Sequence, residues 1–189
     1  MGGGPGDMVQ MLILVSGPPG AGKSTLSKGL GRELNATVLD KDCVDDPFAG
    51  NERGDRYTRD IEPKCLAVLL NLARLNFECG HSVILDVPWT HILINSPEWI
   101  DRLKTCAADS GARLVVVECV IPEVALKERL RQRGLVRDQF RLTDEGWKKF
   151  KQTDRLDRRN PLPHGVIDMR EPADVCLRHA LAYVQKETS

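Results

Sequence analysis

The octapeptide Gly17-Pro18-Pro19-Gly20-Ala21-Gly22-Lys23-Ser24 fits the pattern G-x-x-x-x-G-K-[ST] at every fixed position. An apolar, strand-like run at 9–15 precedes it, and an amphipathic stretch suited to a helix, 23–34, follows it. Glycines let such a loop turn its backbone N–H groups inward around an anion, and the N-terminus of the next helix adds a positive dipole end. The pattern therefore predicts a loop that binds the phosphates of a nucleotide.

Each residue type in this loop suits a chemical role. We expect residues 17–25, Thr25 included, to bind ATP. Lys23 is expected to reach the β- and γ-phosphates and to assist catalysis, and the Ser24 hydroxyl to take one position on Mg²⁺. With its flanking strand and helix, the motif resembles that of the P-loop nucleoside triphosphatases.

Two branches of that superfamily are excluded by motifs that the chain lacks. A GTPase would need Asp-x-x-Gly after a strand and Asn-Lys-x-Asp later, but Asp86 is followed by Val-Pro-Trp and no Asn-Lys-x-Asp occurs. The Leu-Ser-Gly-Gly signature of transporter ATPases is also absent. The remaining resemblance is to small phosphotransferases of the polynucleotide-kinase-like and shikimate–gluconate-kinase-like group.

Continuous apolar runs alternate with amphipathic stretches along the rest of the chain. Such runs are typical of strands buried on both faces, and the alternation predicts an α/β parallel sheet covered by helices. The expected strands are 9–15, 37–40, 82–87, 113–120 and 165–168, and the expected helices are 23–34, 60–79, 96–111, 122–133, 143–156 and 171–185. The resemblance implies the three-layer P-loop NTPase fold, with five strands in the order 2-3-1-4-5 and a helical lid.

The length of 189 residues fits one domain. Hydrophobic residues make up 41% of the chain and charged residues 29%, so a packed core is expected. We interpret residues 1–8 as a flexible leader and 9–189 as a single kinase domain, whose lid spans approximately 134–160.

Two aspartates follow the second predicted strand, at the edge where ligands bind in open α/β sheets. Asp40-Lys41-Asp42 resembles the Asp-x-Asp of shikimate and gluconate kinases. The resemblance implies that Asp40 assists Mg²⁺ and that Asp42 orients the acceptor hydroxyl and takes its proton, which a carboxylate within hydrogen-bond reach can do. An ordinary acidic loop is the alternative, since Asp45 and Asp46 follow.

The third predicted strand ends at Asp86, which we expect to support Mg²⁺ or to contact substrate. Trp89 follows, where it could stack on a ring at the rim of the acceptor pocket or cap the sheet. A surface position is favoured for His91, for which the sequence offers no partner.

A basic segment follows the fourth predicted strand. Over residues 127–160 there are twelve Lys or Arg and six Asp or Glu, a net charge of +6 in a chain whose total is zero. Arg129 and Arg133 share a helix face, a spacing similar to the lid entrance of adenylate-kinase-like and polynucleotide-kinase-like enzymes. The resemblance implies Arg129 near the adenine ring and Arg133 on the phosphates, where it would assist catalysis, with Arg137 and Arg155 as further candidates. For most other residues of the lid, a solvated charged helix is the alternative.

Two further segments carry weaker expectations. The loop 168–172 is where these kinases usually hold adenine, largely through backbone groups. Arg53, Arg56 and Arg59 could clamp an anionic acceptor or could equally be solvated.

Composition excludes some classes of protein. Lys plus Arg and Asp plus Glu both number 27, which argues against a dedicated nucleic-acid coat or membrane-surface binder. No apolar run approaches the ~18 residues that a membrane span needs. The six cysteines form no Cys-x-x-Cys pair and indicate reduced thiols in a cytoplasmic protein.

The first hypothesis is an ATP-dependent phosphotransferase, with Mg²⁺ as cofactor, that acts on a hydroxyl of a small molecule as a monomer or homodimer. A polynucleotide 5′-hydroxyl kinase or a nucleoside monophosphate kinase is the alternative among enzymes, so nucleic acid is possible but not favoured as a partner. A module that binds ATP without transferring phosphate is the alternative of another class.

Overall fold

The computed structural model describes residues 9–49 and 54–188. The predicted leader at 1–8 and Arg53 lie outside the described residues. Within the described part, five parallel strands form one sheet in the order β2-β3-β1-β4-β5. The strands are β1 (Met11–Ser16), β2 (Thr37–Asp40), β3 (Val83–Asp86), β4 (Arg113–Val120) and β5 (Gly165–Asp168). The predicted α/β class and strand order are confirmed.

The central strand β1 is buried on all sides, so a site can form only at the edge where the strands end. Its residues 12–15 have no exposed surface, since β3 pairs with one side of the strand, β4 with the other, and helices cover both faces. The apolar run is continuous for this reason. Parallel pairing also brings the carboxyl ends of the strands to one edge, where Asp40 of β2 stands opposite Asp86 of β3.

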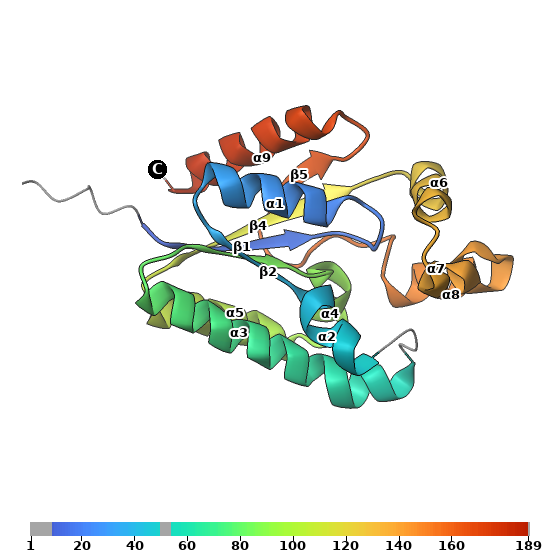
Figure 1. The fold of residues 1–189 in the computed structure, drawn as a ribbon, viewed down its shortest axis with the longest axis horizontal. Helices are drawn as coiled ribbons and strands as arrows, with labels where there is room; N and C mark the ends of the chain where they lie inside the picture. Colours follow the sequence, from blue (N-terminus) through green and yellow to red (C-terminus); the bar gives the residue numbers. More distant parts are fainter. Residues whose placement is uncertain (1–8, 50–53, 189) are drawn as a thin grey trace, which may run out of the picture.

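Helices cover both faces of the sheet (Figure 1). On one face α1 (Lys23–Glu33) and α9 (Ala173–Thr188) pack around Ile13 and Val115. On the other, α3 (Glu62–Glu78), α4 (Trp89–Asn95) and α5 (Glu98–Asp109) pack around Leu14 and Leu85. The shorter α2 (Lys41–Ala49) follows β2 directly, and a π-helical turn at Tyr57–Ile61 leads into α3.

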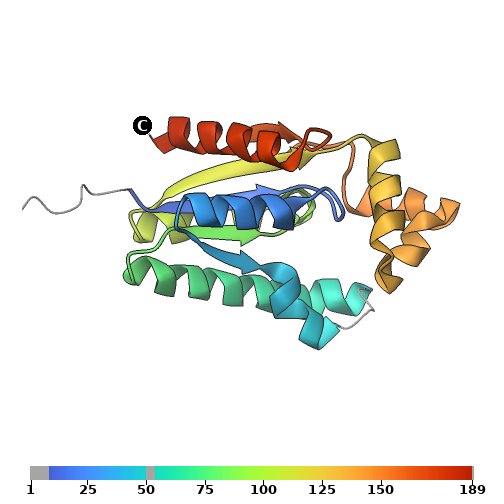
Figure 2. The same cartoon turned by 45° about the horizontal axis from the view of Figure 1, so that its top comes forward.

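The lid lies beyond the carboxyl ends of the strands, at one end of the molecule (Figure 2). Helix α6 (Glu123–Arg133) leads into it, and α7 (Val136–Gln139), a 3₁₀ turn (Phe140–Leu142) and α8 (Asp144–Thr153) follow. Leu126 and Leu130 of α6 pack with Trp147 and Phe150 of α8 in a small core of their own. The helix expected at 143–156 is shorter at both ends. Thr143 caps its start by accepting a hydrogen bond from the backbone of Gly146 at 3.0 Å, and the helix ends before Arg155, whose φ of 53° is left-handed.

A buried network holds the segment that returns from the lid to β5. Glu118 of β4 is 4% exposed and accepts hydrogen bonds from the Thr90 hydroxyl (2.8 Å) and the backbone N–H of Asn160 (3.2 Å). The Nε2 atom of His164 lies 2.9 Å from the same carboxylate. The backbone N–H and the hydroxyl of Thr90 each lie 2.9 Å from the Ser16 hydroxyl. The network thus connects the return of the lid to the strand that precedes the phosphate-binding loop.

A buried cation fixes α2. Lys41 is 3% exposed, and its Nζ lies 2.6 Å from Asp45 Oδ2 and 3.1 Å from Glu62 Oε1. Lys41 also donates a hydrogen bond to the Tyr57 hydroxyl, which in turn donates to Asp45. These bonds join α2 to α3 and so fix the helix that carries Asp42.

We expect Lys41→Met to lower the free energy of unfolding by about 3–5 kcal/mol, because two carboxylates would stay buried without their cation. Urea unfolding measures the change. Lys64→Met removes the same charge from an exposed position on α3 and should change stability by less than about 0.5 kcal/mol. If the two variants were equally stable, the network would not be what holds α2.

Candidate functional site

The predicted phosphate-binding loop joins β1 to α1, and its backbone requires glycine. Gly17 has a φ of 131°, and a Cβ atom there would lie 2.5 Å from the carbonyl oxygen of Cys119 on β4. Gly22 precedes α1 with a φ of 104°, in the left-handed region. The Nζ atom of Lys23 donates to the carbonyl oxygen of Pro18 at 3.2 Å, so the ammonium is held against the loop.

A cavity of about 280 Å³ opens at this loop. Its lining comes from the loop, from the carboxyl ends of β2 and β3, and from the lid. The predicted site residues among them are Pro19, Gly20, Gly22, Lys23, Ser24, Thr25, Asp40, Asp42, Asp86 and Arg133. Lys41, Pro88, Arg137 and Arg141 complete the lining. We call this the phosphate cavity.

Two carboxylates at adjacent strand ends face this cavity. Burial raises the pKa of both Asp40 and Asp86, and the Lys23 ammonium opposes the rise in each. A hydrogen bond from Ser24 also lowers the pKa of Asp86, but the Oδ2 atom of Asp86 is buried without a hydrogen-bond partner among the described residues. An unpaired buried carboxylate oxygen beside a hydroxyl suits a hard divalent cation. Ser24, Asp40 and Asp86 therefore fit the predicted Mg²⁺.

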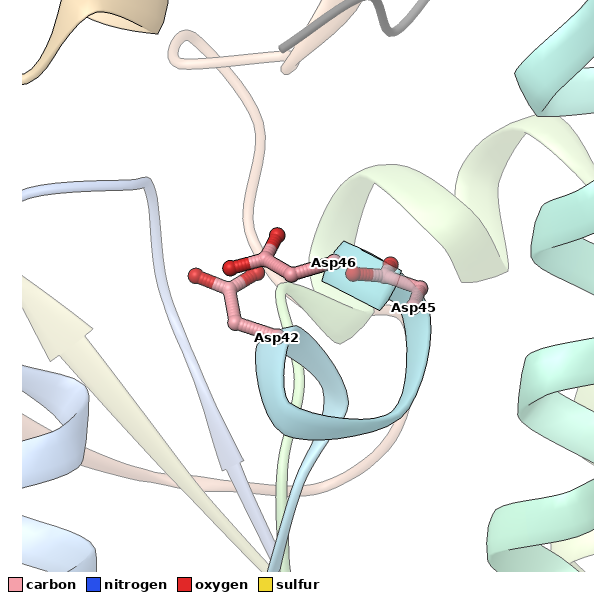
Figure 3. Close-up of side chains that lie close together, drawn as sticks. All are labelled: Asp42, Asp45 and Asp46. Carbon is pink, nitrogen blue, oxygen red and sulfur yellow. The ribbon is translucent and has the colours of Figure 1, made fainter. Parts of the chain in front are cut away.

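Asp42, in the first turn of α2, shares a guanidinium with Asp46. Arg137 Nη2 lies 2.7 Å from Asp42 Oδ2, and Arg137 Nη1 lies 3.0 Å from Asp46 Oδ1. With Asp45 they form a group of three carboxylates whose oxygens lie within 4.8 Å of one another (Figure 3). Each is already paired with Arg137 or Lys41, so we assign no metal ion to this group.

The two arginines predicted at the lid entrance have different partners. The Arg129 guanidinium donates to the carbonyl oxygen of Ala21 at 2.9 Å and to that of Met169 at 2.5 Å. It thereby links the phosphate-binding loop to the loop after β5, where adenine is expected. Arg133 lines the phosphate cavity but donates to Asp138 Oδ2 at 2.6 and 2.8 Å, so its role on the phosphates stays a prediction.

Known proteins are similar to this chain in sequence and in architecture. The family described as "AAA domain" matches residues 12–156, more than half of the chain, and the match contains the phosphate-binding loop and the carboxylates of the cavity. The chain belongs to the AAA domain family. An uncharacterized protein of Mycobacterium tuberculosis (strain H37Rv) is 31% identical over 132 residues, which are 65% of this chain and 26% of that protein.

Two kinases resemble this AAA domain. A shikimate kinase of Corynebacterium efficiens is 38% identical over 101 residues, which are 50% of this chain and 60% of that protein. The crystal structure of a gluconokinase from Sinorhizobium meliloti superposes with a TM-score of 0.64 at 17% identity, covering 93% of this chain and 92% of its own, which shows a common fold. The predicted resemblance to P-loop kinases of the shikimate–gluconate group is confirmed. This chain spans about a quarter of the mycobacterial relative and less than two thirds of the shikimate kinase.

Trp89 is not at the site of this AAA domain, and its prediction as a substrate-binding residue is wrong. The helix α4 begins at Trp89 and turns the indole into the core, where the side chain has no exposed surface. Trp89 lines neither the phosphate cavity nor the larger cavity, which has a volume of about 460 Å³ and adjoins Gly17 and Pro18. A loop rim was expected at this position because no local pattern marks the short helix α4.

The two described arginines between β2 and α3 do not reach the site either. Arg56 and Arg59 are exposed and line neither cavity, and the Arg59 guanidinium lies 2.9 Å from Asp60.

Three residues of the phosphate-binding loop do not line the phosphate cavity. Gly17 and Pro18 line the larger cavity, and Ala21 is buried.

The sequence did not predict the positions of three residues near the site. Lys41 stands between the two predicted aspartates, but its burial depends on α3, which no local pattern shows. Arg141 lines the phosphate cavity and pairs with Asp138 at 2.9 Å. His91, for which a surface position was favoured, is half-buried and lines the larger cavity.

In residues 9–49 and 54–188, no helix has both the length and the apolar composition needed to cross a bilayer.

Proposed function

We propose that this AAA domain is a kinase, an ATP-dependent phosphotransferase that moves the γ-phosphate to a hydroxyl of a small-molecule acceptor. One observation carries the proposal. A single cavity is lined by the phosphate-binding loop, by the carboxylates of Asp40, Asp42 and Asp86, and by three arginines at the lid and its entrance. A module that only held ATP would need no further carboxylate at the transferring phosphate. The kinase names of similar proteins support the same activity.

The phosphate cavity suits a triphosphate. Residues 17–25 would hold it through backbone N–H groups and the Lys23 ammonium. Arg129 and the loop after β5 would flank the adenine ring. Ser24, Asp40 and Asp86 would hold Mg²⁺, which when bound neutralises charge on the β- and γ-phosphates.

Asp42 is the proton acceptor in this proposal. The acceptor oxygen bonds to the γ-phosphorus while the bond from that phosphorus to the β–γ bridging oxygen breaks. The hydroxyl proton passes to the Asp42 carboxylate, and ADP leaves. Arg133, Arg137 and Arg141 bring three positive charges to the same cavity, where they would stabilise the charge of the transferring group.

The cysteines support a cytoplasmic setting. All six are free thiols in the structure, and four of them are buried. Reduced cysteines are usual in a reducing compartment, and we therefore propose that the protein works in the cytoplasm.

Transfer from γ-labelled ATP to a library of hydroxylated metabolites and to a 5′-hydroxyl oligonucleotide tests the proposal. We expect the label on a small hydroxyl compound, and we expect chelation of Mg²⁺ by EDTA to abolish transfer. Label on the oligonucleotide or on a nucleoside monophosphate would assign the alternative enzymes. Binding of Mg·ATP without transfer to any of these would indicate a binding module instead.

A further inference from the structure

A buried carboxylate lies behind the phosphate cavity. Asp138, on α7, has no exposed surface and does not line the cavity. Its Oδ2 atom accepts hydrogen bonds from Arg133 Nε at 2.8 Å and Arg133 Nη2 at 2.6 Å, and its Oδ1 atom accepts one from Arg141 Nη1 at 2.9 Å. One carboxylate therefore binds two of the three arginines that line the phosphate cavity.

A short stretch of chain builds this cluster. The helix α6 ends at Arg133, and Gly134 follows with a φ of 64°, in the left-handed region that favours glycine. The chain then enters α7, where the backbone N–H of Asp138 donates to the carbonyl oxygen of Leu135 at 2.9 Å. Asp138 comes five residues after Arg133 and three before Arg141, so the turn at Gly134 brings all three side chains together.

The two guanidinium groups are held firmly. The Asp138 side chain is 1% exposed, whereas those of Arg133 and Arg141 are 30% and 22% exposed. The Arg141 guanidinium also lies 5.0 Å from the ring centroid of Phe150, in the small core of the lid. Charge-assisted hydrogen bonds are strong, and a carboxylate that is removed from water is little screened. Asp138 therefore fixes both cations against the lid.

The third arginine of the cavity has a different setting. Arg137 pairs with Asp42 and Asp46, whose side chains are 44% and 48% exposed. Exposed ion pairs contribute little free energy, and Asp42 itself lines the cavity, where a ligand can reach it. A ligand can therefore displace the partners of Arg137, but it does not reach the partner of Arg133 and Arg141.

Both fixed guanidinium groups keep donors for a phosphate. A guanidinium has five N–H donors. Arg133 uses Nε and Nη2 for Asp138, and Arg141 uses Nη1. In the part of the chain that the structure describes, these two groups donate hydrogen bonds to Asp138 alone. Arg133 Nη1 and the Nε and Nη2 atoms of Arg141 thus remain available to phosphate oxygens.

We propose that Asp138 is a positioning residue of the phosphotransferase, which acts through Arg133 and Arg141. It holds their charges at the cavity where the transferring group becomes more negative, and it offsets the repulsion between them. Charges that are fixed before the reaction need no rearrangement in the transition state. This inference rests on the proposed function, and it adds the group that sets the geometry of the cations.

The variant Asp138→Asn tests the inference. It keeps the shape of the side chain, but one accepting oxygen becomes an amide that turns N–H donors toward a guanidinium. We expect kcat to fall about 10-fold or more, since a misplacement of about 1 Å can cost about 10²-fold. The Kd of Mg·AMPPNP should not rise, because the variant removes a negative charge from near the phosphates. Initial rates with the acceptor that takes most label in the transfer screen measure kcat, and calorimetry measures the Kd.

A double-mutant cycle separates positioning from a purely structural role. In a background of Arg133→Met and Arg141→Met, Asp138→Asn should cause no further loss of kcat, because the carboxylate acts only through those arginines. Asp144→Asn is the matched control, since Asp144 is exposed in the first turn of α8 and lines neither cavity. Its kcat should equal that of the wild type.

Three results would overturn the inference and leave the kinase proposal intact. They are a wild-type kcat in Asp138→Asn, an equal loss of kcat in the arginine-free background, and a Kd of Mg·AMPPNP that rises in step with the fall in kcat. If Asp138→Asn shows no thermal unfolding transition, Asp138→Glu decides. It keeps the charge but moves the carboxylate by one methylene, so kcat should fall while the Kd of Mg·AMPPNP stays unchanged, and a wild-type kcat would refute the inference. If the wild type transfers no label, the proposed function fails, and this inference fails with it.

Discussion

Lys23→Ala is expected to abolish transfer of the γ-phosphate while the protein remains folded. The Lys23 ammonium is held against the phosphate-binding loop by the Pro18 carbonyl oxygen, inside the phosphate cavity. Its positive charge is in place before the transition state forms, and removing such a preorganised charge costs on the order of 10²-fold or more in turnover. Initial rates of ADP formation at saturating acceptor measure the loss.

A neighbouring cation of the same helix serves as the control for that variant. Arg32→Ala removes a positive charge from an exposed position in the last turn of α1, away from both cavities. Its turnover should equal that of the wild type. Normal turnover in Lys23→Ala, with a normal melting temperature, would overturn the site assignment.

Asp42→Asn is expected to leave ATP affinity nearly intact while acceptor phosphorylation falls by about 10²–10⁴-fold, the usual contribution of a positioned general base. The asparagine keeps the shape of the side chain but cannot take the hydroxyl proton. Calorimetric titration with Mg·ATP and initial rates of acceptor phosphorylation separate the two effects.

The ion pair with Arg137 complicates this variant, and Asp46→Asn controls for it. Asp46 shares the Arg137 guanidinium with Asp42 but does not line the phosphate cavity. A loss seen equally in both variants would come from the position of the lid rather than from proton transfer. Unchanged phosphorylation in Asp42→Asn would mean that another group accepts the proton.

The sheet and the phosphate-binding loop could be predicted because their signals are local. The run at 9–15 is apolar throughout since both faces of β1 are covered, and the glycines at 17 and 22 stand where the backbone needs positive φ. Strand ends carry Asp40 and Asp86 to one edge, so the fold alone brings these carboxylates together. The family resemblance supplied the strand order, which periodicity cannot give.

Residues whose environment depends on distant packing could not be predicted. Trp89 followed a strand end and suggested a rim, but α4 turns it inward. Nothing in the sequence around Lys41 indicates that it is buried, because its partner Glu62 comes from α3. His91 lines a cavity only because residues of the lid, more than fifty positions later in the chain, form the opposite wall.

The hydrogen bonds of Glu118 limit how far the lid can move. The Glu118 carboxylate is shared between the sheet and the returning chain at Asn160, and pulling that chain away would leave a buried charge short of a partner. The segment that follows the lid is therefore held to the sheet at Asn160. Because α6 and α8 share a small core, we expect them to move as one unit, with the attachment at Asn160 kept in place.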